Sequence, residues 1–310
     1  MKITVGICTW NRAKLLDLTL GRMISMRIPE GVTWELLVVN NNSTDDTESV
    51  ITSYENRLPL RRLFEPSPGL SNARNHAIRE AKGGLIIWTD DDVLVDSDWL
   101  AAYAAAADRW PDAAFFGGPI EAWFEGEPPA WLRHVSSFVS RDFGKEPCVL
   151  TGEKLPVGAN MAMRTAVQRH YMFDPELGIR PNSLLCGEET AVFGQMTRDG
   201  LEGRWVPDAR VKHFTPRERQ TMPYLRKYYH GYGLFLARTA EKAETALLFG
   251  YPRWLVRKVL QCELKYRMRR LLCAPDVWID DLVQASTLWG MLEGSRTDRK
   301  QGQIRGRHAH

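Results

Sequence analysis

The chain has 310 residues, 44% of them hydrophobic and 25% charged, which is typical of a soluble globular protein. This length suits one large α/β domain with an appendage, or two small domains. The net charge of +3 gives no argument for a nucleic-acid partner, and no run of about 18 apolar residues predicts a membrane-spanning helix. Five dispersed cysteines without a Cys-x-x-Cys pair, and an N-terminus without the features of a signal peptide, predict reduced thiols in a cytoplasmic protein.

Apolar runs alternate with helical periodicities along the N-terminal part of the chain. Strands are predicted at residues 3–8, 34–39, 60–64 and 86–88, and a helical pattern follows each of the first three. This order predicts an α/β fold with a mostly parallel central sheet and helices on both faces. Because the carboxyl ends of parallel strands meet at one edge, the polar loops that follow them should form a single site.

Three consecutive carboxylates, Asp90, Asp91 and Asp92, follow the last of these strands. Adjacent anions repel one another unless a cation lies between them, and a row of oxygen ligands suits a hard divalent ion such as Mg²⁺ or Mn²⁺. Taken alone, the triplet is equally compatible with an exposed acidic turn that caps a helix. The metal site is favoured because polar loops also follow the neighbouring strands.

Those neighbouring loops contain further candidate residues. Residues 9–12 follow the first strand, and residues 40–47 combine turn and helix-cap residues after the second. In the segment 66–75, Arg74 brings a guanidinium to the start of a predicted helix, and both features favour phosphate. The alternative for Arg74 is a surface arginine in an ion pair along its helix.

The second half of the chain is less regular. A long excursion at 119–157 has no clear period, and a mainly helical segment is predicted at 221–293. Between them, a helix is predicted to begin at Gly187-Glu188-Glu189-Thr190, and strands at 202–206 and 211–214. Residues 251–273 contain seven bases and one acid. They predict either a peripheral contact with an anionic membrane or the solvated face of an ordinary helix pair.

Residues 5–12, 38–47, 66–82 and 86–93 resemble the successive signature loops of family-2 glycosyltransferases, which have the GT-A fold. The likeness extends to about residue 215. It implies a GT-A catalytic domain at 1–218, with a nucleotide-binding half at 1–118 and an acceptor-side half at 119–218. A C-terminal helical region at 219–294 and a basic, disordered tail at 295–310 complete the expected organisation.

The resemblance assigns the metal and ribose contacts. Asp90 is expected to bind the ribose and Asp92 the metal, with Asp91 on the nucleotide side between them. In some relatives of this fold a histidine near the end of the catalytic domain completes the metal shell, and His213 stands at that place. The alternative for His213 is an ordinary core or surface histidine.

The resemblance also assigns contacts to the nucleotide. Thr9 resembles the residue that contacts uracil, and Arg74 belongs to the same nucleotide-binding set. Asn41 stands where many members carry an Asp that recognises the base. Because an amide both donates and accepts hydrogen bonds, Asn41 can still pair with a base edge. The alternative for Asn41 is turn formation.

The sugar side of the site is expected between residues 158 and 189. Gly158 and Asn160 resemble the loop beneath the donor sugar and are expected to face it. The family has an acidic pair whose second member is the general base. Glu188 and Glu189 correspond to that pair in this sequence. Glu189 is therefore expected to be the catalytic base, although a Glu in place of Asp lengthens the reach by one methylene. Both acids could instead simply favour a helix N-terminus.

These features together predict a metal-dependent inverting glycosyltransferase with Mn²⁺ or Mg²⁺ as cofactor. Its donor is expected to be a nucleotide-diphosphate sugar, a UDP-sugar, and its acceptor a carbohydrate or lipid-linked hydroxyl in bacterial polysaccharide, glycolipid or glycoconjugate synthesis. The expected location is cytoplasmic, at the inner face of the membrane if residues 251–273 bind lipid. The alternatives are a sugar-nucleotide nucleotidyltransferase, for which residues 5–12 lack a Gly-rich phosphate loop, and a non-catalytic sugar-nucleotide-binding relative.

Overall fold

The computed structural model describes residues 1–135, 140–152, 154–178, 185–240 and 246–307, with side chains up to residue 296. The chain forms two compact units. The first comprises Met1–Trp123, Ser137–Pro181 and Glu188–Thr215, and the second comprises Phe124–Ser136, Asn182–Gly187 and Pro216–His310. The second unit thus begins mainly at Pro216 and also takes two short segments from earlier in the chain, while the division into domains at residue 218 stays a prediction.

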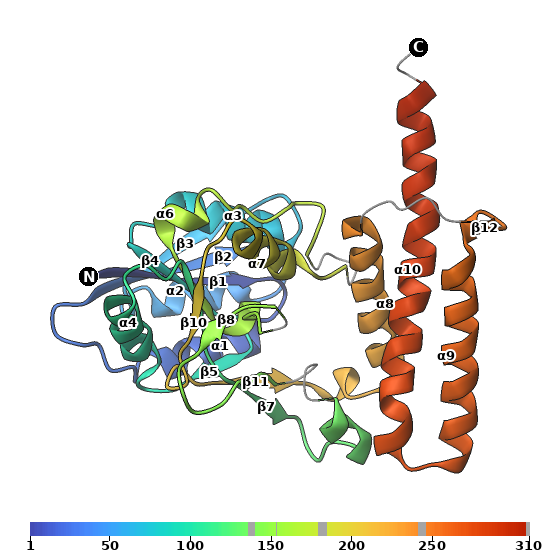
Figure 1. Cartoon of the computed structure of the whole chain (residues 1–310). Helices are drawn as coiled ribbons and strands as arrows, with labels where there is room; N and C mark the ends of the chain where they lie inside the picture. The colour runs from blue at the N-terminus through green and yellow to red at the C-terminus, as the bar shows by residue number, and fades with distance from the viewer. Residues whose placement is uncertain (136–139, 153, 179–184, 241–245, 308–310) are drawn as a thin grey trace. The chain divides into compact units, whose positions relative to one another are not determined.

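The first unit is built on an eight-stranded sheet in the order β3-β2-β1-β4-β9-β6-β10-β8 (Figure 1). Its strands are β1 (Lys2–Thr9), β2 (Thr33–Asn40), β3 (Leu60–Phe64), β4 (Leu85–Trp88), β6 (Phe115–Gly117), β8 (Val149–Leu150), β9 (Met161–Arg164) and β10 (Gly203–Trp205). Strands β1 to β4 pair in parallel, whereas β9 is antiparallel to both of its neighbours. The predicted α/β fold with a mostly parallel central sheet is confirmed.

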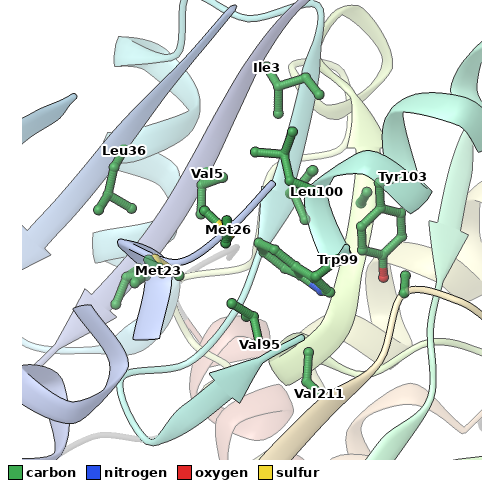
Figure 2. Packing of buried hydrophobic residues seen from close by; sticks show 14 of the residues in the cluster. Ile3, Val5, Met23, Met26, Leu36, Val95, Trp99, Leu100, Tyr103 and Val211 are labelled. Atoms are coloured by element: carbon green, nitrogen blue, oxygen red, sulfur yellow. The ribbon is translucent and has the colours of Figure 1, made fainter. Parts of the chain in front are cut away.

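Successive side chains of β2 pack on opposite faces of this sheet. Leu36 and Val38 lie in one buried cluster, and Leu37 and Val39 lie in another, as the period of two in a strand requires. Helices α1 (Ala13–Met23), α2 (Thr47–Tyr54) and α4 (Trp99–Arg109) contribute to the first cluster, and α3 (Leu70–Glu80) and α7 (Glu188–Arg198) to the second. Figure 2 shows part of the first cluster around Trp99. Helices therefore cover both faces, as predicted.

A smaller three-stranded sheet, in the order β5-β11-β7, adjoins the end of β4. Its strands are β5 (Val93–Val95), β11 (Val211–Thr215) and β7 (Ile120–Phe124). Only β11 had a strand pattern in the sequence. Because β5 begins directly after the acidic triplet and pairs antiparallel with β11, this sheet brings residue 213 back to residue 93.

The second unit consists mainly of three helices, α8 (Met222–Thr239), α9 (Arg253–Leu272) and α10 (Pro275–Arg307), and α10 packs against both of the others (Figure 1). Gly233 and Gly290 let α8 and α10 approach closely, because a Cβ on either glycine would overlap a carbonyl of the other helix. The helical region is confirmed, but α10 runs past residue 294 to Arg307. The predicted disordered tail thus begins as helix. Among the described residues, none of the helices has the length and apolar character that a membrane crossing requires.

Asn160 is fully buried just before β9. Its Oδ1 accepts hydrogen bonds from Trp99 Nε1 and Tyr103 Oη, both at 2.8 Å. Its Nδ2 donates to the carbonyl oxygens of Pro119 at 2.9 Å and Ala209 at 2.7 Å. Every hydrogen-bonding position of the amide is thus used inside the core. The prediction that Asn160 faces a donor sugar is wrong, and the residue instead joins α4 to the segments before β7 and β11.

Asn160→Ala should therefore lower the free energy of unfolding by about 3 kcal/mol or more, since a buried polar group that loses its partner costs about 1–3 kcal/mol. Urea unfolding followed by tryptophan fluorescence measures this loss. Asn72→Ala is the matched control, because Asn72 makes one exposed hydrogen bond to the Pro68 carbonyl, and it should change the same free energy by less than about 1 kcal/mol. Equal effects of the two substitutions would contradict the structural role of Asn160.

Candidate functional site

The acidic triplet forms a turn between β4 and β5, and Arg12 holds it. Arg12 lies in the loop after β1, and its Nη1 donates to Asp91 Oδ1 at 2.8 Å and to Asp92 Oδ2 at 2.7 Å. The Thr19 hydroxyl donates to the Asp91 carbonyl at 3.0 Å and ties the turn to α1. Sequence reasoning placed Arg12 in a site loop but gave it no role. The sequence contained one indication of this role, a basic residue in the polar loop that follows β1, the strand adjacent to β4.

Asp90, Asp92 and His213 form a group that could hold a metal ion. One donor atom from each residue lies within 4.8 Å of the others. His213 reaches the turn because it pairs with Val93 across the β5–β11 ladder, and its Nε2 lies 3.1 Å from Asp92 Oδ1. The structure thus brings together the two predicted ligands, Asp92 and His213, and adds Asp90, which the sequence assigned to the ribose.

The charges of the triplet are offset by neighbouring side chains. Burial alone would lower the pKa of His213, but the charge of Asp92 and the hydrogen bond to it raise that pKa to about 9. Burial raises the pKa of Asp91 to about 6, although the charge of Arg12 opposes the shift. At neutral pH the imidazole therefore carries a proton while Asp91 is ionised.

Arg74, in α3, is almost completely buried, with 3% of its side chain exposed. Its Nη1 lies 3.1 Å from Glu188 Oε1 and 3.1 Å from Glu189 Oε1, and its Nη2 lies 3.6 Å from Asp90 Oδ1. One guanidinium therefore connects the acidic turn to the first turn of α7. The alternative of a surface arginine is wrong. Direct contact of Arg74 with phosphate stays a prediction, and the observed contacts give it the separate role of holding three carboxylates together.

The two acids at the start of α7 have different environments. Burial raises the pKa of Glu188 to about 8, the charge of Glu189 adds to the shift, and Arg74 opposes it. Glu188 is therefore mainly protonated at neutral pH. Its side chain is 3% exposed, whereas that of Glu189 is 15% exposed. Of the pair, Glu189 is thus the more accessible to an acceptor, and its role as base stays a prediction.

Gly158, in the 3₁₀ turn η2 (Gly158–Asn160), lies against this cluster. A Cβ on Gly158 would overlap both the Arg74 guanidinium and the Glu189 carboxylate. The absence of a side chain therefore allows the ion pair to form where it does. The structure places Gly158 at the site, as predicted, while its contact with a donor sugar stays a prediction.

Thr9 and Asn41 both lie at the carboxyl edge of the sheet. Thr9 is buried at the end of β1, with its hydroxyl beside the Asp91 carboxylate. The Asn41 amide holds the following loop, since it donates to the carbonyl oxygens of Glu65 and Ser67 and accepts from the Gly69 amide. This is the turn-forming alternative. A contact between Asn41 and a nucleotide base stays a prediction that depends on the second lone pair of its oxygen.

The sequence model of the family described as "Glycosyl transferase family 2" matches residues 4–170, which is more than half of the chain. The chain belongs to this family. The succinoglycan biosynthesis protein ExoM of Rhizobium meliloti (strain 1021) is 27% identical to this glycosyltransferase over 236 residues, covering 73% of the present chain and 71% of ExoM. Family membership rules out the nucleotidyltransferase interpretation.

Two solved structures show the same fold. The mannosyltransferase of Pyrobaculum calidifontis, in complex with GDP-Man and Mn²⁺, superposes on this glycosyltransferase with a TM-score of 0.62 at 18% identity, covering 94% of the present chain and 86% of the other. The S. aureus TarS fragment 1–349, in complex with UDP-GlcNAc, gives a TM-score of 0.57 at 16% identity, with coverages of 97% and 92%. The GT-A fold expected from the sequence is confirmed.

Gly158→Ala should lower the rate of sugar transfer on the order of 10²-fold, because the added methyl group displaces Arg74 and Glu189, and a misplacement near 1 Å at a site can cost that much. Steady-state transfer assays measure the loss. Gly194→Ala is the matched control, since Gly194 lies in α7 with Glu189 and a Cβ there makes only an ordinary contact at 3.5 Å with Arg198. A Gly158→Ala enzyme as active as the control would show that this cluster does not depend on Gly158.

Proposed function

We propose that this glycosyltransferase is metal-dependent and inverting, and that it moves a sugar from a UDP-sugar to an acceptor hydroxyl. The observation that carries the proposal is the position of Arg74, 3.1 Å from Glu189 and 3.6 Å from Asp90. Arg74 contacts both the acidic turn, where the donor diphosphate would bind, and the proposed base, so these two parts of the site are separated only by its guanidinium. A sugar between them would have its leaving group on one side and its acceptor on the other.

Asp90, Asp92 and His213 suit a divalent ion in their donor chemistry. Two carboxylates and one imidazole, with donor atoms within 4.8 Å of one another, form a set that Mn²⁺ accepts, provided that the ion displaces the proton that His213 carries at neutral pH. A bound divalent ion would neutralise the negative charge that develops on the departing diphosphate. Arg12 donates to Asp92 Oδ2, whereas His213 lies beside Asp92 Oδ1. These two contacts fix the orientation of the Asp92 carboxylate.

Glu189 is proposed to accept the proton of the acceptor hydroxyl as that oxygen attacks the anomeric carbon. A single displacement of this kind inverts the configuration at that carbon. Arg74 orients the Glu189 carboxylate through Oε1, at 3.1 Å, and Glu189 is the more exposed acid of its pair. Glu188, whose pKa burial raises to about 8, is proposed to act as a neutral hydrogen-bond donor or acceptor beside the sugar.

The similar proteins support the proposed substrates. ExoM is named for succinoglycan biosynthesis, and TarS is named as a poly(ribitol-phosphate) β-N-acetylglucosaminyltransferase and was solved with UDP-GlcNAc. These names favour a UDP-sugar donor and a carbohydrate or polymer acceptor in bacterial polysaccharide synthesis. A screen of UDP-, GDP- and dTDP-sugars for slow donor hydrolysis, in the presence of Mn²⁺, tests the donor class directly.

Removal of the metal should abolish both transfer and tight binding of UDP. Chelation should stop donor hydrolysis, and added Mn²⁺ or Mg²⁺ should restore it. In calorimetry, Asp92→Asn should weaken Mn²⁺-dependent UDP binding by roughly tenfold or more, while the exposed Asp112→Asn should leave it unchanged. Full activity in excess chelator would show that this glycosyltransferase does not require a metal.

Glu189→Gln should reduce transfer on the order of 10²–10⁴-fold, the usual contribution of a general base, with UDP affinity almost unchanged. The nearly isosteric Glu188→Gln is the matched control and should cost much less, because that acid is mainly protonated at neutral pH. A large loss for Glu188→Gln with a small one for Glu189→Gln would reverse the assignment. If neither matters with the true acceptor, the inverting mechanism is wrong.

A further inference from the structure

Helix α9 has two apolar faces, and α10 covers only one of them. Leu255, Val259 and Cys262 of α9 are buried in a cluster with Ala285 and Leu288 of α10. A helix at the surface of a globular protein normally carries one apolar stripe and a polar opposite side. The second apolar face of α9 therefore has no role in the packing of this helix pair.

The second face is a continuous row of large apolar side chains. Leu260, Leu264, Met268 and Leu271 are 60, 61, 55 and 85% exposed. Their spacings of four, four and three residues place them on one side of the helix. Monomeric proteins rarely leave such contiguous apolar rows in contact with water, so this row indicates a binding surface.

The hairpin that precedes α9 carries a further exposed apolar side chain next to the N-terminal end of the helix. It is formed by β12 (Leu247–Leu248) and β13 (Tyr251–Pro252), and the Phe249 side chain in its turn is 92% exposed. Phe249 has a positive φ of 51°, a backbone conformation that bulky residues rarely adopt. An aromatic side chain exposed in this way makes little packing contact with the second unit and is accessible to a partner.

Bases without acidic partners accompany the row. Among the described residues, Arg253, Arg257 and Lys258 take part in none of the ion pairs that the structure contains, although α9 has other bases that do. The paired bases contact Glu263 or Asp281. By helical spacing Arg253 and Arg257 share the exposed face with Leu260 and Leu264. The binding surface thus combines apolar side chains with uncompensated positive charge.

We propose that this surface, defined as Phe249 with the exposed face of α9, binds an anionic lipid surface. Leucine, phenylalanine and methionine side chains would enter the boundary between headgroups and acyl chains, while the bases contact anionic headgroups. A second copy of the chain is a poorer occupant, because pairing of the same faces would bury two surfaces that carry the same excess of positive charge. The inference does not depend on the proposed function.

Co-sedimentation of the full chain with vesicles tests the proposal. The protein should bind phosphatidylcholine vesicles that contain phosphatidylglycerol, bind pure phosphatidylcholine vesicles weakly, and dissociate as salt is raised. The double substitution Arg253→Glu with Arg257→Glu should weaken binding by roughly tenfold or more, since it reverses two attractions to the anionic surface on the face that carries the apolar row. Lys145→Glu with Lys154→Glu makes the same change in net charge at exposed positions of the first unit and should have little effect.

The apolar part is tested by Leu264→Ser with Met268→Ser, which should also weaken binding while the thermal unfolding midpoint stays close to that of the wild type, because both side chains are exposed. Absence of binding at low salt would overturn the proposal. So would equal losses for both charge-reversal pairs, which would indicate a general charge effect. A dimer that the Leu264 and Met268 substitutions dissociate, without vesicle binding, would assign the surface to a second copy instead.

Discussion

Buried negative charge is the constraint on which the site depends. Five carboxylates gather at one edge of the sheet and share three basic side chains; the acids are Asp90, Asp91, Asp92, Glu188 and Glu189, and the bases are Arg12, Arg74 and His213. An ionised carboxylate without a partner is very costly away from water. The acids therefore take their positions from the bases. Because the acids outnumber the bases even when the mainly protonated Glu188 is left out, the edge also retains an attraction for a further cation.

The three bases come from parts of the chain that are far apart in sequence. Arg12 follows β1, Arg74 lies in α3, and His213 lies in β11. Arg12 and His213 can reach the acidic turn only when the strands have their observed neighbours, since β1 lies beside β4 and β11 lies beside β5. Assembly of the site is thus a consequence of the sheet topology, and the ion pairs in turn fix the loops at its edge.

The sequence alone predicted those strands and helices whose residues follow a regular hydrophobic pattern. The strands β1 to β4 and the helices between them follow from runs and periods that can be recognised in the sequence. The short strands β5 and β7 and the antiparallel β9 do not, because they are defined by partners elsewhere in the chain. The same limit applies to single residues. Asn160 and Arg74 were recognised as polar residues near the site, but no local feature indicates that one is used inside the core and the other among three acids.

The average charge of the chain conceals two opposite local charges. A net charge of +3 over 310 residues gave no indication of a partner. The structure separates an excess of carboxylates in the first unit from an excess of bases on α9 in the second. Interactions between exposed charges fade within about 10 Å at moderate ionic strength. Each region therefore attracts ligands according to its local charge, which the net charge of the chain does not indicate. The acidic edge favours a divalent cation, and the basic helix favours an anionic surface.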